Sequence, residues 1–64
     1  MCLSSVFKKG SEENIFLCKY IARVLPKDGK VVCYDLMGQR TVFAGEILDI
    51  DLMENIILIK EAGE

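Results

Sequence analysis

The sequence predicts an all-β fold, a small antiparallel barrel of the SH3-like or OB-like type with five to seven short strands. Apolar residues recur with a period of two in short segments, which is typical of half-buried strands. Turns that contain glycine separate these segments at regular spacing. The chain has 64 residues, so we expect a single domain over 1–64.

The expected strands follow one another along the chain. They cover 2–8, 14–25, 30–36, 39–44, 46–52 and 56–60. Only the second segment, NIFLCKYIARVL, is long enough for a helix. Its β-branched and aromatic residues favour one strand, or two short strands joined near Lys19.

Turn residues predict how these strands are connected. Asp-Gly at 28–29 stands between apolar runs and indicates a hairpin. The stretches 37–38 and 53–55 indicate two further turns. Gly45 indicates a bend or bulge between two strands.

The apolar content is high for so short a chain. Hydrophobic residues make up 52% of it, and the mean hydropathy is +0.30. A domain of this size buries only about 60% of the surface of its unfolded chain. The surplus of apolar surface predicts self-association, and a two-fold homodimer is the commonest closed assembly.

The charge balance and the cysteine count limit the partners and the compartment. Eight basic residues stand against ten acidic ones, with a net charge of −2 and a pI near 5.0, so nucleic-acid binding is not expected. No apolar run is long enough for a membrane span, and Lys8 and Lys9 follow the apolar start, where a signal peptide would place them first. We expect a cytoplasmic protein with three free thiols.

The sequence offers no catalytic constellation. It contains no histidine, which excludes Ser–His and Cys–His pairs and imidazole zinc sites. It also contains no CxxC pair, phosphate-binding glycine loop or calcium loop. We therefore expect a protein that is not an enzyme.

Cys2 is the candidate metal ligand. Removal of Met1 would leave its α-amine and its thiolate on one residue, and these two groups close a five-membered chelate ring on a metal. Planar nitrogen and thiolate donors suit Ni(II) or Cu(II). A dimer with adjacent N-termini would supply two such thiolates. The competing interpretation is that Cys2 only begins a strand and packs, as Cys18 and Cys33 are expected to do as small buried side chains.

Two other groups of residues have a functional interpretation and a structural one. Alternation along 46–52 puts Ile47, Asp49 and Asp51 on one face, where two carboxylates suit a hard cation or simply form the solvated face of a strand. Four aromatic residues suit a base-stacking platform or, more often, a core. These are Phe16, Tyr20, Tyr34 and Phe43.

The order of several short motifs resembles the CooT-type small nickel-binding proteins, a family also called predicted RNA-binding proteins. A more distant similarity, through the Met-Cys-Leu start, is to the HypC/HupF hydrogenase-maturation chaperones. The motifs are the start MCL, Asp35-Leu36 followed by Gly38, Gly45-x-Ile47, Ile50-Asp51-Leu52 and the apolar segment 56–59.

The CooT resemblance implies an SH3-like barrel that dimerises and binds one Ni(II) between its subunits through Cys2. It further implies a metallochaperone-like role, in which nickel is supplied to a nickel enzyme such as carbon monoxide dehydrogenase. The alternative is a chaperone of HypC type that uses Cys2 on a maturation partner. An RNA-binding barrel would need a basic groove, and the scattered cations offer none.

Overall fold

The computed structural model describes residues 2–63, which form five β-strands. The strands are β1 (Ser4–Lys8), β2 (Ile15–Lys27), β3 (Lys30–Asp35), β4 (Arg40–Asp51) and β5 (Ile56–Glu61). This part of the chain contains no helix, and hence none long and apolar enough to cross a membrane.

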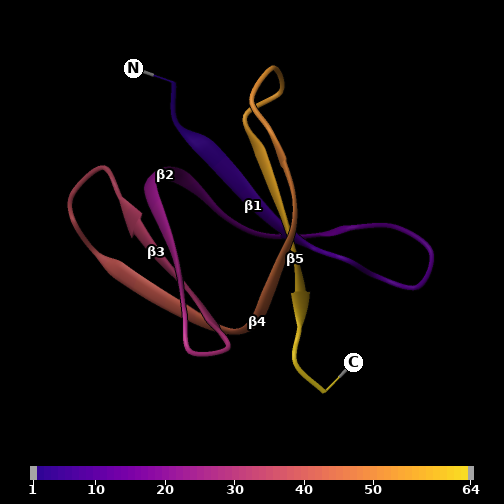
Figure 1. The fold of residues 1–64 in the computed structure, drawn as a ribbon. Coiled ribbons are helices and arrows are strands. Elements are labelled where there is room, and N and C mark those ends of the chain that lie inside the picture. The colour runs from indigo at the N-terminus through magenta and orange to yellow at the C-terminus, as the bar shows by residue number, and fades with distance from the viewer. Residues whose placement is uncertain (1, 64) are drawn as a thin grey trace.

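The strands form one closed barrel in the order β1-β2-β3-β4-β5 (Figure 1). Four neighbouring pairs are antiparallel, and β1 pairs with β5 in parallel to close the ring. The prediction of a small all-β barrel is confirmed. The expected antiparallel order holds except at this closure, which no turn signal in the sequence encodes because the two strands are far apart along the chain.

β2 is one long bent strand that serves two neighbours. Its first part pairs with β1 and its second part with β3. At the bend, Tyr20 has a φ of 62° and the register shifts on both sides of Ile21. Such bulges bend a strand and increase its twist. The alternative of two short strands near Lys19 is therefore realised as a bend within a single strand.

β4 has the same design, with Gly45 at its bend. Residues 40–44 pair with β3 and residues 45–51 with β5, so the two strands expected at 39–44 and 46–52 are one. Gly45 has a φ of 151°, and a Cβ there would collide with the carbonyl oxygen of Lys60. Only glycine permits this close approach of two strand backbones.

A second irregularity in β4 reverses the expected alternation. Ile47 pairs with Ile59, whereas Asp49 pairs with Leu58, so the register slips by one residue at Leu48. Successive residues of β5 point to opposite faces, so Ile47 and Asp49 lie on opposite faces as well. The prediction that they share a face is wrong, because a bulge inserts one residue between them.

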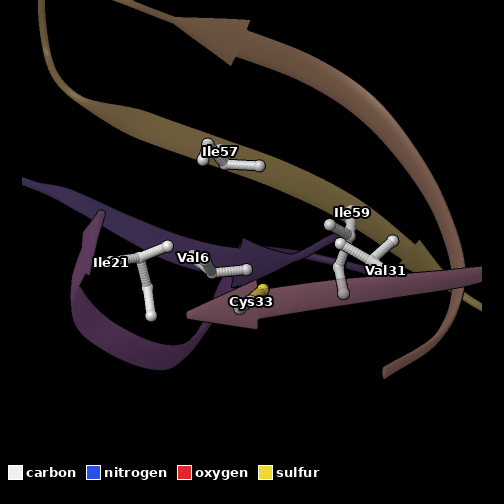
Figure 2. Packing of buried hydrophobic residues seen from close by; sticks show 6 residues of the cluster. All are labelled: Val6, Ile21, Val31, Cys33, Ile57 and Ile59. Carbon is white, nitrogen blue, oxygen red and sulfur yellow. The ribbon is translucent and has the colours of Figure 1, made fainter. Parts of the chain in front are cut away.

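The barrel interior is filled by small branched side chains and one thiol (Figure 2). β1, β2, β3 and β5 contribute the buried residues, and five partly buried side chains extend the cluster, among them Cys18 of β2 and Phe43 and Ile47 of β4. Branched aliphatic residues suit the narrow interior of a five-stranded barrel. The buried cluster comprises Val6, Ile21, Val31, Cys33, Ile57 and Ile59.

Candidate metal centre

Cys2 precedes β1 and is exposed to solvent. Leu3 beside it is half-buried, and Ser4 is paired with Ile21 of β2. The backbone N–H of Ser5 donates a hydrogen bond to the carbonyl oxygen of Asn55 at 2.9 Å. The chain is thus fixed within three residues of Cys2. Cys2 directly precedes this fixed segment, and β1 begins at one end of the barrel (Figure 1).

The other two thiols lie in or against the core. Cys33 is fully buried, as the sequence predicts, and Cys18 is half-buried against the core cluster. Burial raises the pKa of Cys18, and burial together with the nearby Cys18 raises the pKa of Cys33 to about 11. Because the thiolate is the metal ligand, both residues are poorly suited to bind a metal at neutral pH.

A single subunit does not supply a complete side-chain ligand set. Within residues 2–63, no group of three or more Cys, Asp and Glu side chains lies close enough together to hold an ion. Cys2 can contribute its thiolate and backbone nitrogen, and Met1, whose removal the chelate ring requires, lies outside the described residues. This donor set fits a planar Ni(II) site only when a second subunit adds its own Cys2.

The two aspartates proposed for a hard cation have other surroundings. Asp51 Oδ1 accepts hydrogen bonds from the backbone N–H groups of Met53 and Glu54, both at 3.0 Å. Asp49 is exposed on β4. The structure therefore supports the interpretation that Asp49 lies on the solvent-exposed face of a strand. The hydrogen bonds of Asp51 stabilise the turn that follows β4.

The four aromatic residues do not act as one group. Phe43 packs against the core, whereas Phe16 is exposed and meets Phe7 edge-on at 5.6 Å between ring centres. The Nζ of Lys19 lies over the ring of Tyr20, 4.9 Å from its centre. The guanidinium carbon of Arg23 lies over the ring of Tyr34, 5.6 Å from its centre. The core prediction is confirmed for Phe43 and is wrong for Phe16 and Tyr20, because these two side chains of β2 are more than half exposed.

A feature that sequence reasoning missed is a pair of matching turns. The tripeptide Asp-Leu-Met occurs at 35–37 and again at 51–53. Asp35 Oδ1 accepts hydrogen bonds from the N–H groups of Met37 and Gln39, at 2.9 and 2.8 Å, much as Asp51 does in its own turn. The repeated tripeptide was the available signal.

In both turns the leucine and the methionine point to solvent. The exposed fractions are 61% for Leu36, 85% for Met37, 80% for Leu52 and 94% for Met53. We call these four residues the Leu-Met rim. These side chains leave apolar surface exposed to water at both turns.

The Leu-Met rim lies at the same end of the barrel as Cys2. The turn with Leu52 and Met53 joins β4 to β5, and its Asn55 is bonded to Ser5. The other turn begins with Leu36, whose N–H donates to the carbonyl oxygen of Tyr20 at 3.0 Å, next to the pairing of β2 with the start of β1. In Figure 1 both turns lie toward the N-terminal side of the barrel.

Comparison with known proteins agrees with this fold. The crystal structure of a protein assigned as a CooT from Carboxydothermus hydrogenoformans superposes with a TM-score of 0.82 at 20% sequence identity, covering 94% of this chain and 97% of the other. No curated protein matches the chain. The family model described as CO dehydrogenase accessory protein CooT matches residues 1–60. The chain therefore belongs to the CooT family of CO dehydrogenase accessory proteins.

Proposed function

We propose that the protein is a homodimer that binds Ni(II) through Cys2 of each subunit and supplies the metal to a CO dehydrogenase. The family assignment supports the accessory role. CO dehydrogenase is a nickel enzyme, so an accessory protein that binds nickel could supply the metal that the enzyme needs. In this role the protein is not an enzyme but handles the metal for one.

The observation that carries the proposal is the position of Cys2 among the three thiols. It alone of the three is exposed, and it stands at the end of the barrel that carries the Leu-Met rim. A two-fold axis through this end would bury the exposed leucines and methionines and bring two Cys2 residues together. Isologous contacts of this kind repeat each ligand once per subunit.

Each subunit's residues have a defined task in this arrangement. The thiolate of Cys2 and the nitrogen of the same residue bind the metal in one plane, which suits the geometry that Ni(II) prefers. The hydrogen bond from Ser5 to Asn55 holds the chain start against the β4–β5 turn. The Leu-Met rim excludes water around the thiolates, which strengthens their attraction for a cation.

Nickel titration tests the ligand. Adding Ni(II) to the purified protein should produce a thiolate-to-nickel charge-transfer band that saturates at one metal per dimer. Cys2→Ser should abolish the band and weaken binding at least 100-fold. Cys18→Ala, which removes a half-buried thiol, is the matched control and should bind nickel like the parent. Tight binding by Cys2→Ser would overturn the proposal.

The dimer face is tested separately. Met53 is 94% exposed, so Met53→Asp should leave the barrel folded, as circular dichroism would show, while native mass spectrometry detects monomers. Leu48 is also apolar and exposed but lies away from the Leu-Met rim, so the Leu48→Asp variant should remain dimeric. A parent protein that is monomeric with and without nickel would contradict the dimer and favour the alternative, in which Cys2 and the rim contact a maturation partner of HypC type.

A further inference from the structure

The loop between β1 and β2 borders an open pocket on the part of the barrel away from Cys2. The pocket has a volume of about 710 Å³. Its lining residues come from the loop itself and the start of β2, from β4 and from β5. The lining residues are Lys9, Gly10, Ser11, Ile15, Leu48 and Lys60.

The apolar part of the pocket is Ile15 together with Leu48. Their exposed fractions are 47% and 42%. Leu48 is the extra residue of the β4 bulge, which turns it out of the regular alternation. Gly10 leaves Ile15 uncovered, because a Cβ at that position would already touch Ile15 Cδ1 at 3.5 Å. The backbone irregularities on both sides thus keep an apolar surface open.

Two lysines flank this apolar surface. Lys9 directly follows β1, and its N–H donates to the carbonyl oxygen of Ile59 at 2.9 Å, which places Lys9 beside the segment of β5 that contains Lys60. Neighbouring like charges repel each other. Over residues 2–63 neither lysine forms an ion pair, although Glu46 stands opposite Lys60 in the β4–β5 ladder. No carboxylate lines the pocket, so the charged side chains that line it are both positive.

We propose that this pocket binds an acidic segment of a partner protein, with one apolar side chain packed on Ile15 and Leu48 and flanking carboxylates near Lys9 and Lys60. The charge of the pocket and its apolar floor together specify this chemistry, because neither a purely acidic nor a purely apolar segment satisfies both. If Cys2 lies in a dimer interface, as the proposed function requires, the pocket stays open and each dimer presents two of them. Two linked pockets would raise the effective affinity for a partner that is itself dimeric.

The probe is a set of heptapeptides with the pattern acid–apolar–acid, in which Leu, Phe, Ile and Met are placed between Asp or Glu residues. Peptides with lysine in place of the acids, and octanoate as a small apolar carboxylate, serve as comparison ligands. Binding is followed by amide chemical shifts of the ¹⁵N-labelled parent protein. The acidic peptides should shift the amides of residues 9–15, Leu48 and Lys60, and the lysine peptides should shift none of them.

Variants then locate the contacts. Lys9→Glu and Lys60→Glu should each weaken binding of the best peptide about tenfold, and Leu48→Asp should do the same. Lys27→Glu, the same charge change at the β2–β3 turn, should have no effect. Folding of each variant is checked by the dispersion of its own spectrum, so a lost interaction is distinguished from a lost fold.

Three outcomes would overturn the inference. They are no shift with any acidic peptide at millimolar concentration, binding by Lys9→Glu and Lys60→Glu that is as tight as binding by the parent protein, and shifts with octanoate but not with peptides. Nickel stoichiometry is measured on the same samples. If nickel binds normally while peptides do not, this inference fails and the proposed function stands; if peptides bind while nickel does not, the reverse holds.

Discussion

Ser5 and Asn55 are joined by a backbone hydrogen bond of 2.9 Å that ties the start of β1 to the β4–β5 turn. Residues distant in sequence thus hold the segment with Cys2 beside the segment with Leu52 and Met53. The exposed thiol and the exposed apolar side chains are therefore parts of one rigid end of the barrel.

The three thiols should differ sharply in reactivity. With iodoacetamide at pH 8, exposed Cys2 should be alkylated first and half-buried Cys18 more slowly, while buried Cys33 should react only on unfolding. Peptide mapping by mass spectrometry over a time course gives the order. Added nickel should slow the reaction at Cys2 alone. Equal rates at all three residues in the folded protein would show that the barrel interior is open to solvent.

Stability should fall at high pH because of Cys33. Its pKa in the folded protein is raised from 9.0 to about 11, so the folded state favours the protonated thiol. The associated stabilisation is complete below pH 9 and is lost as the pH rises toward 11. Urea unfolding between pH 7 and 10.5 measures this loss. The comparison is with Cys33→Val, whose loss of stability with rising pH in this window should be shallower.

Ile59 is the most informative core residue to shorten. It is fully buried, and Ile59→Ala should reduce the free energy of unfolding by about 2–5 kcal/mol, since it removes apolar contacts and leaves a cavity. Ile59→Val should cost only about 0.5–1.5 kcal/mol. Urea denaturation of both variants gives the two values. A loss below 1 kcal/mol for the alanine variant would mean that the interior collapses around the gap.

Asp35 should stabilise its turn through both of its hydrogen bonds. Asp35→Ala leaves the N–H groups of Met37 and Gln39 without their acceptor, at a cost of about 1–2 kcal/mol. Asp35→Asn retains an oxygen acceptor and should cost much less. Amide hydrogen exchange at residues 37 and 39 reports the loss locally. If both variants exchange equally fast, the carboxylate does not hold the turn.

Gly45 and Gly38 allow backbone strain to be separated from collision. Both have positive φ, but a Cβ at Gly38 meets no atom within 4 Å, whereas one at Gly45 collides with the backbone of Lys60. Gly38→Ala should therefore cost about 1 kcal/mol from strain alone, and Gly45→Ala considerably more. Thermal unfolding ranks the two. Equal melting temperatures would show that β5 moves aside without cost.

The elements of this barrel follow from local patterns, but its closure does not. Period-two runs and the turn residues at 28–29, 37–38 and 53–55 locate the strands and three of their connections. The two strands predicted on either side of Gly45 are one strand, which the sequence did not predict, because a glycine can end a strand or bend it. The close approach of the Lys60 carbonyl to Gly45, which shows that the strand bends there, is visible only in the structure. The parallel pairing of β1 with β5 depends on contacts more than 40 residues apart and leaves no local signal.

The candidate site was predictable in one part only. The chemistry of an early thiol singles out Cys2 from the sequence, and the structure adds that Cys18 and Cys33 are withdrawn into the interior. The Leu-Met rim was not predicted, since Leu36 and Leu52 were assigned to strands and Met37 and Met53 to turns. An exposed apolar turn contradicts the usual expectation that turns are hydrophilic, which is why the repeated tripeptide went unused.

The parallel closure also has a practical result for handling the protein. Because β1 and β5 run in the same direction, the chain enters β1 at one end of the barrel and leaves β5 at the opposite end (Figure 1). A purification tag or a fluorophore joined to the carboxyl end would stand clear of the thiol. Immobilisation through that end on a sensor surface would orient every molecule with its cysteine toward the solution, ready for a metal or a second chain.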